Sequence, residues 1–304
     1  MSLLVVGTVA FDGLETPFGV RESILGGSAT YIGISAGYFV DKVNLVSVVG
    51  GDFPEADIEL LKEKNIDIEG LQIIKEGKTF FWKGKYHNDM NSRDTLETQL
   101  NVLESFDPLI PENYKDCKYL MLGNLVPSIQ LMVLEQLTQR PKLVVMDTMN
   151  LWMDATMDDL KKMLKRVDLL TINDEEARQL SEENNLIEAA EKIKTMGPST
   201  LIIKKGEHGA LLFGKEQEIF FTPALPLQEV LDPTGAGDTF AGGLMGYLSQ
   251  TDDISFSNIK RALVYASTMA SFCVQKFGPE GLEDLSTEAI ESRKNELLSL
   301  TDLS

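Results

Sequence analysis

The sequence predicts an α/β protein in which helices cover both faces of a mostly parallel central sheet, with a small β-lid attached. Three observations support this prediction. Short apolar segments rich in β-branched residues alternate with amphipathic helical segments along the chain. Several of these apolar segments are apolar on both faces, as strands between two helical layers are. One region replaces the alternation with consecutive extended segments.

The predicted strands are short and apolar: Leu3–Gly7, Val43–Val49, Tyr119–Leu122, Leu143–Met146, Asp168–Ile172, Leu201–Ile203 and Ala210–Phe213. The predicted helices have apolar residues at helical spacing: Ala29–Phe39, Ala56–Lys64, Ser128–Gln139, Met157–Leu164, Glu175–Glu182, Ile187–Met196, Thr239–Leu248 and Ile259–Val274. The charged tail from Glu283 is also predicted to be helical. Strand–helix alternation of this kind is typical of a layered α/β fold.

Two stretches depart from the alternation, approximately residues 13–24 and 71–102. Pro17 and Gly19 oppose helix in the first, and Gly77 and Gly84 separate extended segments in the second. We expect both stretches to form a small lid inserted within one domain of residues 1–304, because a projecting flap often covers a ligand. An edge hairpin without function is the alternative.

The chain is strongly acidic, since 28 Lys and Arg residues against 47 Asp and Glu residues give a formal net charge of −19. We therefore expect neither nucleic acid nor a membrane surface as a partner, because their phosphates would be repelled. Cys117 and Cys273 are the only cysteines and form no zinc-ligand pattern. The N-terminus lacks a signal-peptide pattern and no long apolar run occurs, so we expect a cytoplasmic protein.

The most informative segment is Asp232–Gly243, which reads Asp-Pro-Thr-Gly-Ala-Gly-Asp-Thr-Phe-Ala-Gly-Gly. Its glycines allow a tight turn, after which a helix is expected to begin. Backbone N–H groups at a helix N-terminus, together with the positive end of the helix dipole, bind an anion without basic side chains. We therefore predict an anion site at Gly235, Ala236 and Gly237 that can hold a phosphate in this acidic chain.

Asp238 has two interpretations. It can be a favourable residue at a helix start and nothing more. Alternatively, its carboxylate takes a proton from a hydroxyl that attacks a phosphate held at the anion site. Other phosphate motifs fit poorly, because a Walker A loop needs Gly-Lys-Ser/Thr and the dinucleotide fingerprint needs a third glycine where Phe240 stands.

Asn173 and Glu176 follow a predicted strand and open a helix. Asn-x-x-Glu is the pattern of a capping box, which explains the pair without any ligand. At the carboxyl end of a strand, the same side chains can orient phosphate or hold Mg²⁺ through water. Farther along, Lys204 begins a predicted hairpin turn in which Gly206 and Gly209 allow a nucleotide to approach the backbone closely.

A second glycine-rich point lies near the N-terminus. Asp12 follows the first predicted strand, and Gly26, Gly27 and Ser28 open the next helix. A carboxylate beside this helix start suits the vicinal hydroxyls of a polyol, because carboxylate oxygens accept hydrogen bonds. A simple turn is the alternative, since a Gly-Gly pair alone is a weak signal.

In this order, the motifs resemble those of the ribokinase-like (PfkB-type) carbohydrate kinase family. Residues 232–240 match the family's C-terminal signature, and the earlier motifs follow its order: Gly26-Gly27, Gly51-Asp52-Phe53, Asn173-x-x-Glu176 and Gly206-x-x-Gly209. The resemblance covers essentially the whole chain. It implies a three-layer α/β/α ribokinase-like fold with a β-lid, and an ATP-dependent kinase that uses Mg²⁺.

The resemblance also implies roles for individual residues. The catalytic base would be Asp238, beside an anion hole made by Gly235, Ala236 and Gly237. Phosphates and Mg²⁺ would be served by Asn173 and Glu176. The nucleotide would lie near Lys204, Gly206, Gly209, Ser267 and Gly278, with the segment Ala266–Gly278 closing the adenine pocket. Substrate hydroxyls would be bound by Asp12, Gly26, Gly27 and Ser28. Asp232 stands where some members bind a monovalent cation such as K⁺.

The acceptor half departs from ribokinase itself. Ala10, Ser28 and Tyr31 stand at positions where ribokinase has the Asn, Lys and Asn that clamp ribose. A nucleoside base could instead stack on aromatic side chains, or these could be core and lid packing: Phe11, Tyr31, Phe80 and Trp82.

We therefore predict an ATP-dependent phosphotransferase that phosphorylates a hydroxymethyl group of a sugar or sugar-like substrate, with Asp238 as general base. A nucleoside kinase of the same family is the first alternative. A non-catalytic sugar- or nucleotide-sensing protein that retains the fold is the second. A vitamin-type kinase is disfavoured by the early Asp12 motif and the lid. Lid strands can pair between subunits, which allows a homodimer.

Overall fold

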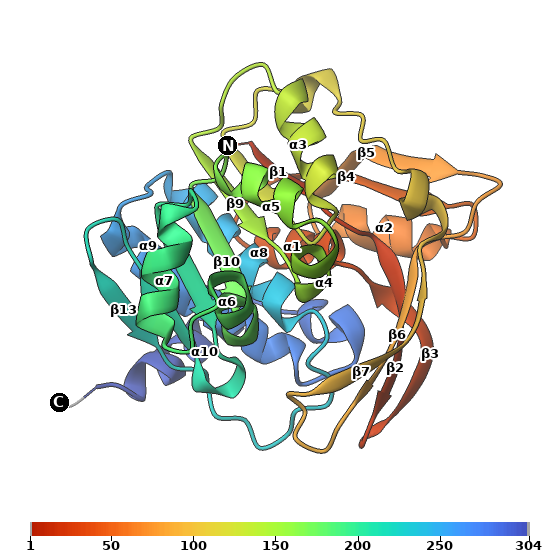
Figure 1. Ribbon diagram of the computed structural model, residues 1–304. Coiled ribbons are helices and arrows are strands. Elements are labelled where there is room, and N and C mark those ends of the chain that lie inside the picture. Colours follow the sequence, from red (N-terminus) through yellow and green to blue (C-terminus); the bar gives the residue numbers. More distant parts are fainter. Residues whose placement is uncertain (1, 303–304) are drawn as a thin grey trace.

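The computed structural model describes residues 2–302. Its main sheet is built from β1 (Leu3–Val6), β4 (Val43–Gly50), β5 (Ile66–Ile74), β8 (Tyr119–Leu122), β9 (Leu143–Asp147), β10 (Leu169–Asn173), β11 (Thr200–Lys204), β12 (Ala210–Phe213) and β13 (Ile219–Thr222). These nine strands lie in the order β13-β12-β11-β10-β9-β8-β1-β4-β5 (Figure 1). The strands from β11 to β5 are parallel, and β12 and β13 are antiparallel to their neighbours.

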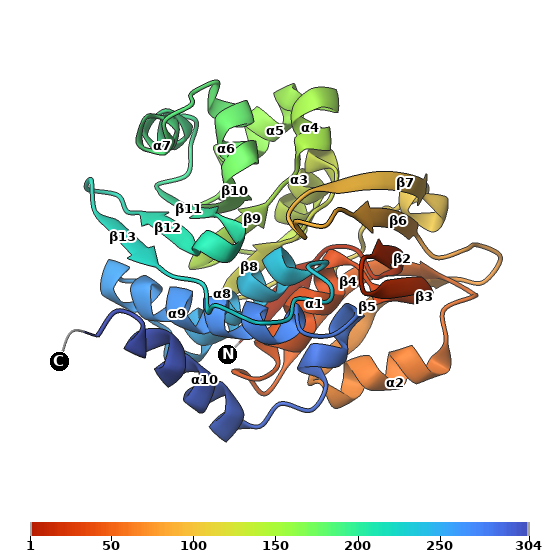
Figure 2. The same cartoon turned by 90° about the horizontal axis from the view of Figure 1, so that it is seen from below.

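Helices cover both faces of this sheet (Figure 2). One face carries α3 (Pro127–Gln136), α4 (Asn150–Ala155), α5 (Met157–Leu164), α6 (Asp174–Ser181) and α7 (Leu186–Thr195). The other carries α1 (Ser28–Ala36), α2 (Glu55–Glu63), α8 (Ala236–Thr251), α9 (Phe256–Cys273) and α10 (Thr287–Ser299). The predicted three-layer α/β/α fold is confirmed. Among residues 2–302, no helix combines the length and the apolarity that a membrane crossing requires.

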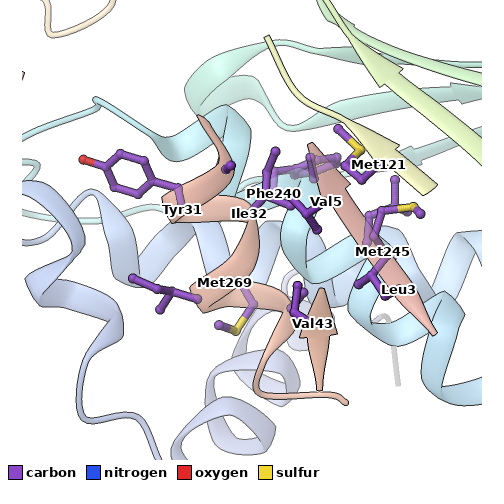
Figure 3. Packing of buried hydrophobic residues seen from close by; sticks show 14 of the residues in the cluster. Leu3, Val5, Tyr31, Ile32, Val43, Met121, Phe240, Met245 and Met269 are labelled. Atoms are coloured by element: carbon purple, nitrogen blue, oxygen red, sulfur yellow. The ribbon is translucent and has the colours of Figure 1, made fainter. Parts of the chain in front are cut away.

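Two hydrophobic cores separate the sheet from its helices. In β1, Leu3 and Val5 point into the core under α1, α8 and α9, whereas Leu4 and Val6 point into the core under α3, α5 and α6. Figure 3 shows part of the first core, in which Leu3 and Val5 meet Phe240 and Met245 of α8. Strands apolar on both faces are needed because each face is covered, and each fully buried Val or Leu contributes about 1.5–3 kcal/mol.

Helices α1 and α8 pack closely through glycines. A Cβ on Gly242 would overlap the carbonyl oxygen of Ile32, and a Cβ on Gly246 would lie 2.9 Å from the Cα of Ala36. Any side chain at these two positions would therefore push the helices apart. The close packing brings the N-termini of α1 and α8 to the same end of the molecule, where the predicted site residues lie.

The extended segments form a second, four-stranded sheet, which we call the lid sheet. Its strands are β2 (Ala10–Thr16), β3 (Gly19–Gly26), β6 (Phe81–Tyr86) and β7 (Arg93–Gln99), in the order β3-β2-β6-β7. It projects from one side of the main sheet (Figure 1). The prediction that the lid includes residues 71–74 is wrong, because they belong to β5 and pair with β4 of the main sheet. Residues 101–105 form a short 3₁₀ helix instead of extended chain.

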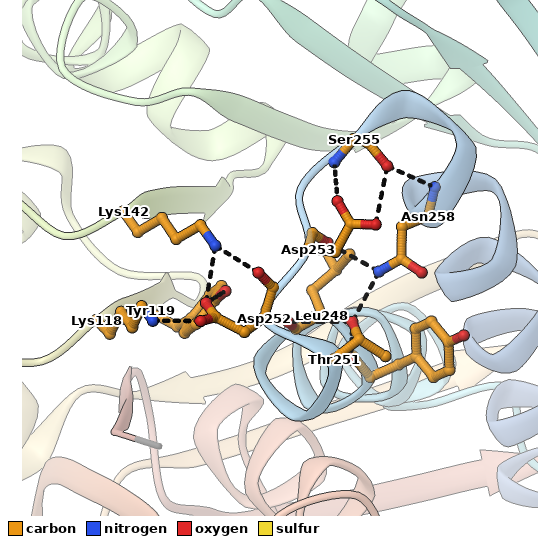
Figure 4. Close-up of polar contacts among 10 residues, drawn as sticks. Lys118, Tyr119, Lys142, Leu248, Thr251, Asp252, Asp253, Ser255 and Asn258 are labelled. Carbon is orange, nitrogen blue, oxygen red and sulfur yellow. Dashed lines mark hydrogen bonds and ion pairs between the residues drawn. The ribbon is translucent and has the colours of Figure 1, made fainter.

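Asp252 caps the C-terminal end of α8. It lies at the amino ends of the parallel strands, whereas the predicted site lies at their carboxyl ends. Its carboxylate is paired with Lys118 and accepts hydrogen bonds from Lys142 Nζ at 2.8 Å and from the Tyr119 hydroxyl at 2.7 Å (Figure 4). Lys118 precedes β8 and Lys142 precedes β9, so one carboxylate joins the end of α8 to the starts of two strands. These contacts hold the pKa of Asp252 well below its usual value.

Candidate active site

Three polar side chains lie at the carboxyl ends of neighbouring parallel strands. Asp147 ends β9, Asn173 ends β10 and Lys204 ends β11. Asp147 is in register with Thr171 of β10, and Asn173 is in register with Lys204. In an open parallel sheet, ligands bind outside the carboxyl ends of the strands. These residues therefore lie at the edge of the sheet where a ligand site is expected.

The loop before α8 exposes backbone donors at the same edge. Gly235 caps the helix with a φ of 74°, and no side chain caps the first turn. A Cβ on Gly235 would overlap the ring of Tyr31, so both backbone angle and space require glycine here. The Ala236 N–H donates to the carbonyl of Pro233 at 3.2 Å. Of the three predicted anion-hole donors, the N–H groups of Gly235 and Gly237 therefore remain without a hydrogen-bond partner among residues 2–302 and are available to a ligand.

Asp238 lies in the first turn of α8 and is partly exposed. It makes no capping hydrogen bond, so the capping interpretation does not describe its side chain. Although part of the residue is exposed, desolvation by the protein atoms around its carboxylate and the negative charge of Asp147 raise its pKa to about 7, against the opposing effects of Lys204 and Arg93. A carboxylate with a pKa near neutrality has the proton affinity that a general base needs.

Lys204 lies directly beside Gly237 at the start of α8. A Cβ built on Gly237 would be 3.1 Å from its Nζ, so the ammonium group lies against the first turn of α8. The same Nζ donates to Oδ2 of Asp147 at 2.7 Å. Burial disfavours the charge on Lys204, but Asp147 and Glu176 outweigh that effect and raise its pKa. The charged form of Lys204 is therefore favoured beside the free N–H groups of α8.

Asn173 and Glu176 form a complete capping box at the start of α6. The Asn173 side chain accepts from the Glu176 N–H, and the Glu176 carboxylate accepts from the Asn173 N–H, each at 2.7 Å. The capping interpretation is therefore correct as geometry. Glu176 is also buried near Asp147, and both effects raise its pKa to about 7. A cap does not require burial next to a second carboxylate. The Oε1 atom of Glu176 accepts no hydrogen bond among residues 2–302, so it remains available to a ligand.

The predicted nucleotide hairpin forms between β11 and β12, with positive φ angles at Gly206 and Gly209. The two glycines differ in surroundings. A Cβ on Gly209 would overlap the Thr222 carbonyl, so Gly209 serves the packing of the hairpin. At Gly206, a Cβ would meet only Oδ1 of Asn91, in the turn between β6 and β7. The lid sheet therefore reaches the hairpin, and the Asn91 amide donates to Glu207 at 3.4 Å.

The predicted acceptor residues divide into two groups. Asp12 is buried against Gly26, and burial together with Asp232 and Asp238 raises its pKa to about 7. Asp12 therefore belongs to the same charged site as Asp238. Ser28 does not, because its hydroxyl accepts from the Thr8 N–H at 3.0 Å and lies 3.2 Å from the Thr8 hydroxyl. These contacts assign Ser28 to the joint between β1 and α1.

Asp232 ties two loops together. Its carboxylate accepts from the Thr234 N–H and from the Gly278 N–H, each at 2.9 Å. Gly278 has a φ of 58° and lies beside Ile24 of β3, which places it under the lid sheet. Ser267 is buried in α9 and makes no hydrogen bond with its side chain among residues 2–302. The structure thus connects Gly278 with Asp232, whereas within residues 2–302 no hydrogen bond joins the Ser267 side chain to the other site residues.

Sequence reasoning missed three residues of this site. Asp147 directly follows a predicted strand, the same signal that singled out Asn173, and could have been found by it. Arg93 of β7 lies far in sequence from Asp12, Glu176 and Asp238, yet its positive charge lowers the pKa of all three carboxyl groups. Tyr86 of β6 is bonded to Thr234 in the loop before α8. No local pattern marks these two, because only the lid sheet brings them to the site.

The donor set fits a magnesium-bound nucleotide. Unpartnered N–H groups and Lys204 suit phosphate oxygens, and Gly206 leaves the backbone open. Within residues 2–302, no cluster of three or more His, Cys, Asp and Glu side chains could hold a metal alone. Mg²⁺ binds through one or two carboxylates together with substrate phosphates, so Glu176 would hold it at this edge together with the phosphates of a bound nucleotide.

Comparison with known proteins extends these observations. The pfkB family carbohydrate kinase domain matches residues 21–284. A cytidine kinase from Thermococcus kodakarensis is 33% identical over 254 residues, which cover 81% of this chain and 88% of that protein.

Solved structures share the fold. The nucleoside kinase of Burkholderia thailandensis in complex with inosine matches with a TM-score of 0.78 at 18% identity, covering 98% of this chain and 99% of that chain. A candidate Ribokinase II from Escherichia coli, in complex with ATP and Mg²⁺, gives 0.80 at 18% identity with the same coverage. The family resemblance predicted from the motifs is confirmed. The chain belongs to the pfkB family of carbohydrate kinases.

Proposed function

We propose that the protein transfers the γ-phosphoryl group of ATP to a hydroxymethyl group of a sugar-like substrate, with Asp238 as the general base. The observation that carries this proposal is the position of Asp238. It lies in the first turn of α8, free of a capping bond, beside unpartnered N–H groups and the cation of Lys204. A base next to an anion site is the minimum that phosphoryl transfer requires.

Each part of the site has a task in this reaction. Asp12 accepts hydrogen bonds from substrate hydroxyls and orients the acceptor toward Asp238. The N–H groups of Gly235 and Gly237 bind phosphate oxygens where negative charge is concentrated. The lid sheet excludes water that would otherwise hydrolyse ATP. Mg²⁺, held by Glu176 through water and by the phosphates, would neutralise charge on the phosphate oxygens.

We further propose a nucleoside as the acceptor ahead of a free sugar. Support comes from the relative named cytidine kinase, which is 33% identical over 81% of this chain. It also comes from the ribose-clamping positions, where Ala10 has no polar group and the Ser28 hydroxyl is bonded to Thr8. A nucleoside can compensate for these lost contacts through its base.

The test is a coupled assay of ADP release across nucleosides, pentoses, hexoses and sugar phosphates, with and without K⁺. We expect turnover of one or more nucleosides, cytidine among them, and about 10²- to 10⁴-fold lower kcat for Asp238→Asn with ATP binding retained. The kcat/KM should rise as pH increases through 7, because the base must be ionised. Asp252→Asn, a matched change at the far end of α8, should leave the pH profile unchanged.

Other outcomes would reject parts of this proposal. Turnover of free sugars without nucleosides rejects the acceptor class. Near-normal kcat in Asp238→Asn rejects the base. Ligand-induced stabilisation without turnover of any acceptor favours the non-catalytic sensing function. A dependence on K⁺ that is lost in Asp232→Asn would support a monovalent cation at Asp232.

The remaining assignments are also part of the proposal. A kinase that consumes ATP requires a compartment rich in ATP, which favours the cytoplasm. The acidic net charge of −19 disfavours nucleic acid and anionic membrane as partners. Strand β7 lies at the edge of the lid sheet and is exposed along its length, so it can pair with a second copy. Sedimentation equilibrium with a Leu96→Lys variant tests this homodimer.

A further inference from the structure

A buried ion pair lies at the centre of the site. Lys204 Nζ is 2.7 Å from Oδ2 of Asp147, and their side chains are only 17% and 8% exposed. A buried ion pair often stabilises a fold no better than well-packed apolar residues, because both charges must leave water. Its presence at the carboxyl edge of the sheet therefore calls for another role.

Neighbouring groups fix Asp147 from two sides. Its Oδ1 accepts from the Thr148 N–H at 2.7 Å, and its Oδ2 accepts from the Thr171 hydroxyl at 3.1 Å. Oδ2 thus receives both the Thr171 hydroxyl and the Lys204 ammonium group. A carboxylate held in this way has one orientation, and it transmits that orientation to the lysine.

The lysine in turn lies against the helix that binds the anion. Its Nζ is 3.1 Å from the position that a Cβ on Gly237 would occupy. The Gly237 N–H, one of the free donors, is therefore next to the ammonium group. Lysine has three donor hydrogens. With one directed at Asp147, others remain for an oxygen anion at the start of α8.

We propose that Lys204 binds the transferred phosphoryl group itself, and that Asp147 is the positioning residue that directs Lys204 toward it. This inference rests on the proposed kinase function. The proposed function places Lys204 only near the nucleotide. The inference extends it by making Lys204 a catalytic residue that contacts the γ-phosphate.

In the proposed reaction, the Lys204 ammonium group lies beside the phosphoryl group that is transferred. The acceptor oxygen forms a bond to the γ-phosphorus, and its proton passes to the Asp238 carboxylate. The bond between the γ-phosphorus and the β,γ-bridging oxygen breaks, and its electron pair leaves on ADP. Lys204 contacts the oxygens of the group in transit throughout, so it stabilises the transition state without exchanging a proton.

Nucleotide binding tests the contact directly. Calorimetry with AMP-PNP, a non-hydrolysable ATP analogue, and with ADP should show that Lys204→Met weakens AMP-PNP about tenfold, as expected for losing one charge-assisted hydrogen bond. ADP, which lacks the γ-phosphate, should lose less than about threefold. An equal loss for both nucleotides would overturn the contact with the γ-phosphate. Lys142→Met, which removes a cation bonded to Asp252, is the matched control and should change neither affinity.

Turnover tests the positioning role. Asp147→Asn should lower kcat about tenfold while leaving acceptor KM within about twofold. Its AMP-PNP affinity should be retained or tightened, because a negative charge beside the phosphate is removed. A residue that merely supports the fold would weaken affinity, turnover and thermal stability together, and that pattern would overturn the proposal.

A double-mutant cycle links the two residues. In a Lys204→Met background, Asp147→Asn should cause little further loss of kcat, because Asp147 acts through Lys204. Independent losses that multiply would overturn the link. If Asp147→Asn alone fails to fold, the comparison of the double variant with Lys204→Met still decides the question, since neither leaves a buried unpaired lysine.

The same binding experiment distinguishes failure of the proposed kinase function from failure of the role of Lys204. Absence of AMP-PNP binding by the unaltered protein would reject the kinase assignment, and the role of Lys204 with it. Binding of AMP-PNP with no selective loss in Lys204→Met would reject the role of Lys204 alone.

Discussion

The hydroxyl of Tyr86 lies 3.0 Å from the hydroxyl of Thr234. This hydrogen bond joins strand β6 of the lid sheet to the loop that precedes α8. Tyr86 is only 4% exposed and packs with Leu14 and Phe277 in a small hydrophobic cluster. The lid sheet is therefore fastened to the loop that precedes α8 by a hydrogen bond and by apolar packing.

Removing this hydroxyl should loosen the lid. We expect Tyr86→Phe to raise the acceptor KM severalfold and to increase ATP hydrolysis in the absence of acceptor, because water gains access to the site. The loss of one hydrogen bond should cost about 1 kcal/mol of folding free energy. Steady-state kinetics with and without acceptor measure both effects. Tyr265→Phe, which removes a hydroxyl bonded to Glu291, is the control and should leave the hydrolysis rate unchanged.

Asp238 should destabilise the ligand-free protein above neutral pH. Burial and Asp147 raise its pKa to about 7 in the folded state. Between pH 4 and 7, the folded state holds a proton that the unfolded state has released, so folding stability falls as pH rises through this range. Asp238→Asn stays neutral and should therefore be about 1–3 kcal/mol more stable at pH 8. Urea unfolding at pH 5 and pH 8 measures the difference.

Asp252→Asn is the control, because it should change folding stability at pH 8 in the opposite direction. Lys118, Lys142 and Tyr119 hold the pKa of Asp252 below its usual value, so its stabilising effect is present above the unfolded pKa and is lost in acid. This variant should be less stable than the unaltered protein at pH 8. A loss of stability at pH 8 in Asp238→Asn would contradict the raised pKa.

Two glycines of the anion loop should respond differently to alanine. Gly237 lies within α8, so alanine should preserve or raise stability by about 0.5 kcal/mol while displacing Lys204 and lowering kcat about tenfold. Gly235 has a φ of 74° and contacts Tyr31, so alanine should cost about 2–4 kcal/mol. Thermal unfolding and kcat, measured for both variants, separate the two effects. Equal stability losses would be evidence against this assignment.

Ser28 should behave as a structural residue. Its hydroxyl is bonded to Thr8, so Ser28→Ala should lower stability by about 1–2 kcal/mol and leave acceptor KM within about twofold. Asp12→Asn is the comparison and should raise acceptor KM, because its carboxylate lies in the charged site. A large change in acceptor KM without a change in stability for Ser28→Ala would instead support the original prediction that Ser28 binds the acceptor.

Local patterns were sufficient for much of the fold, and they also led to the prediction that Asp238 is the base. The apolar strands and amphipathic helices were recognisable because burial on both faces of a sheet imposes a composition on each segment. Asp238 and its glycines were singled out because a helix N-terminus that binds an anion needs backbone freedom at adjacent positions, and their catalytic role stays a prediction. The lid boundary at residues 71–74 was wrong because an extended segment reads the same in either sheet, and only pairing with β4 assigns it to β5.

The sequence by itself determined the layered fold and the family, and it predicted an anion site at the start of α8, because each depends on residues close together in the chain. The tertiary structure decided which charges meet. Asp147 and Lys204 are 57 positions apart, and Tyr86 and Thr234 are 148 apart. Strand order and lid pairing create these contacts, and burial at the contact then shifts the pKa of Asp238. Such long-range electrostatics depends on distance and desolvation, which no local pattern encodes.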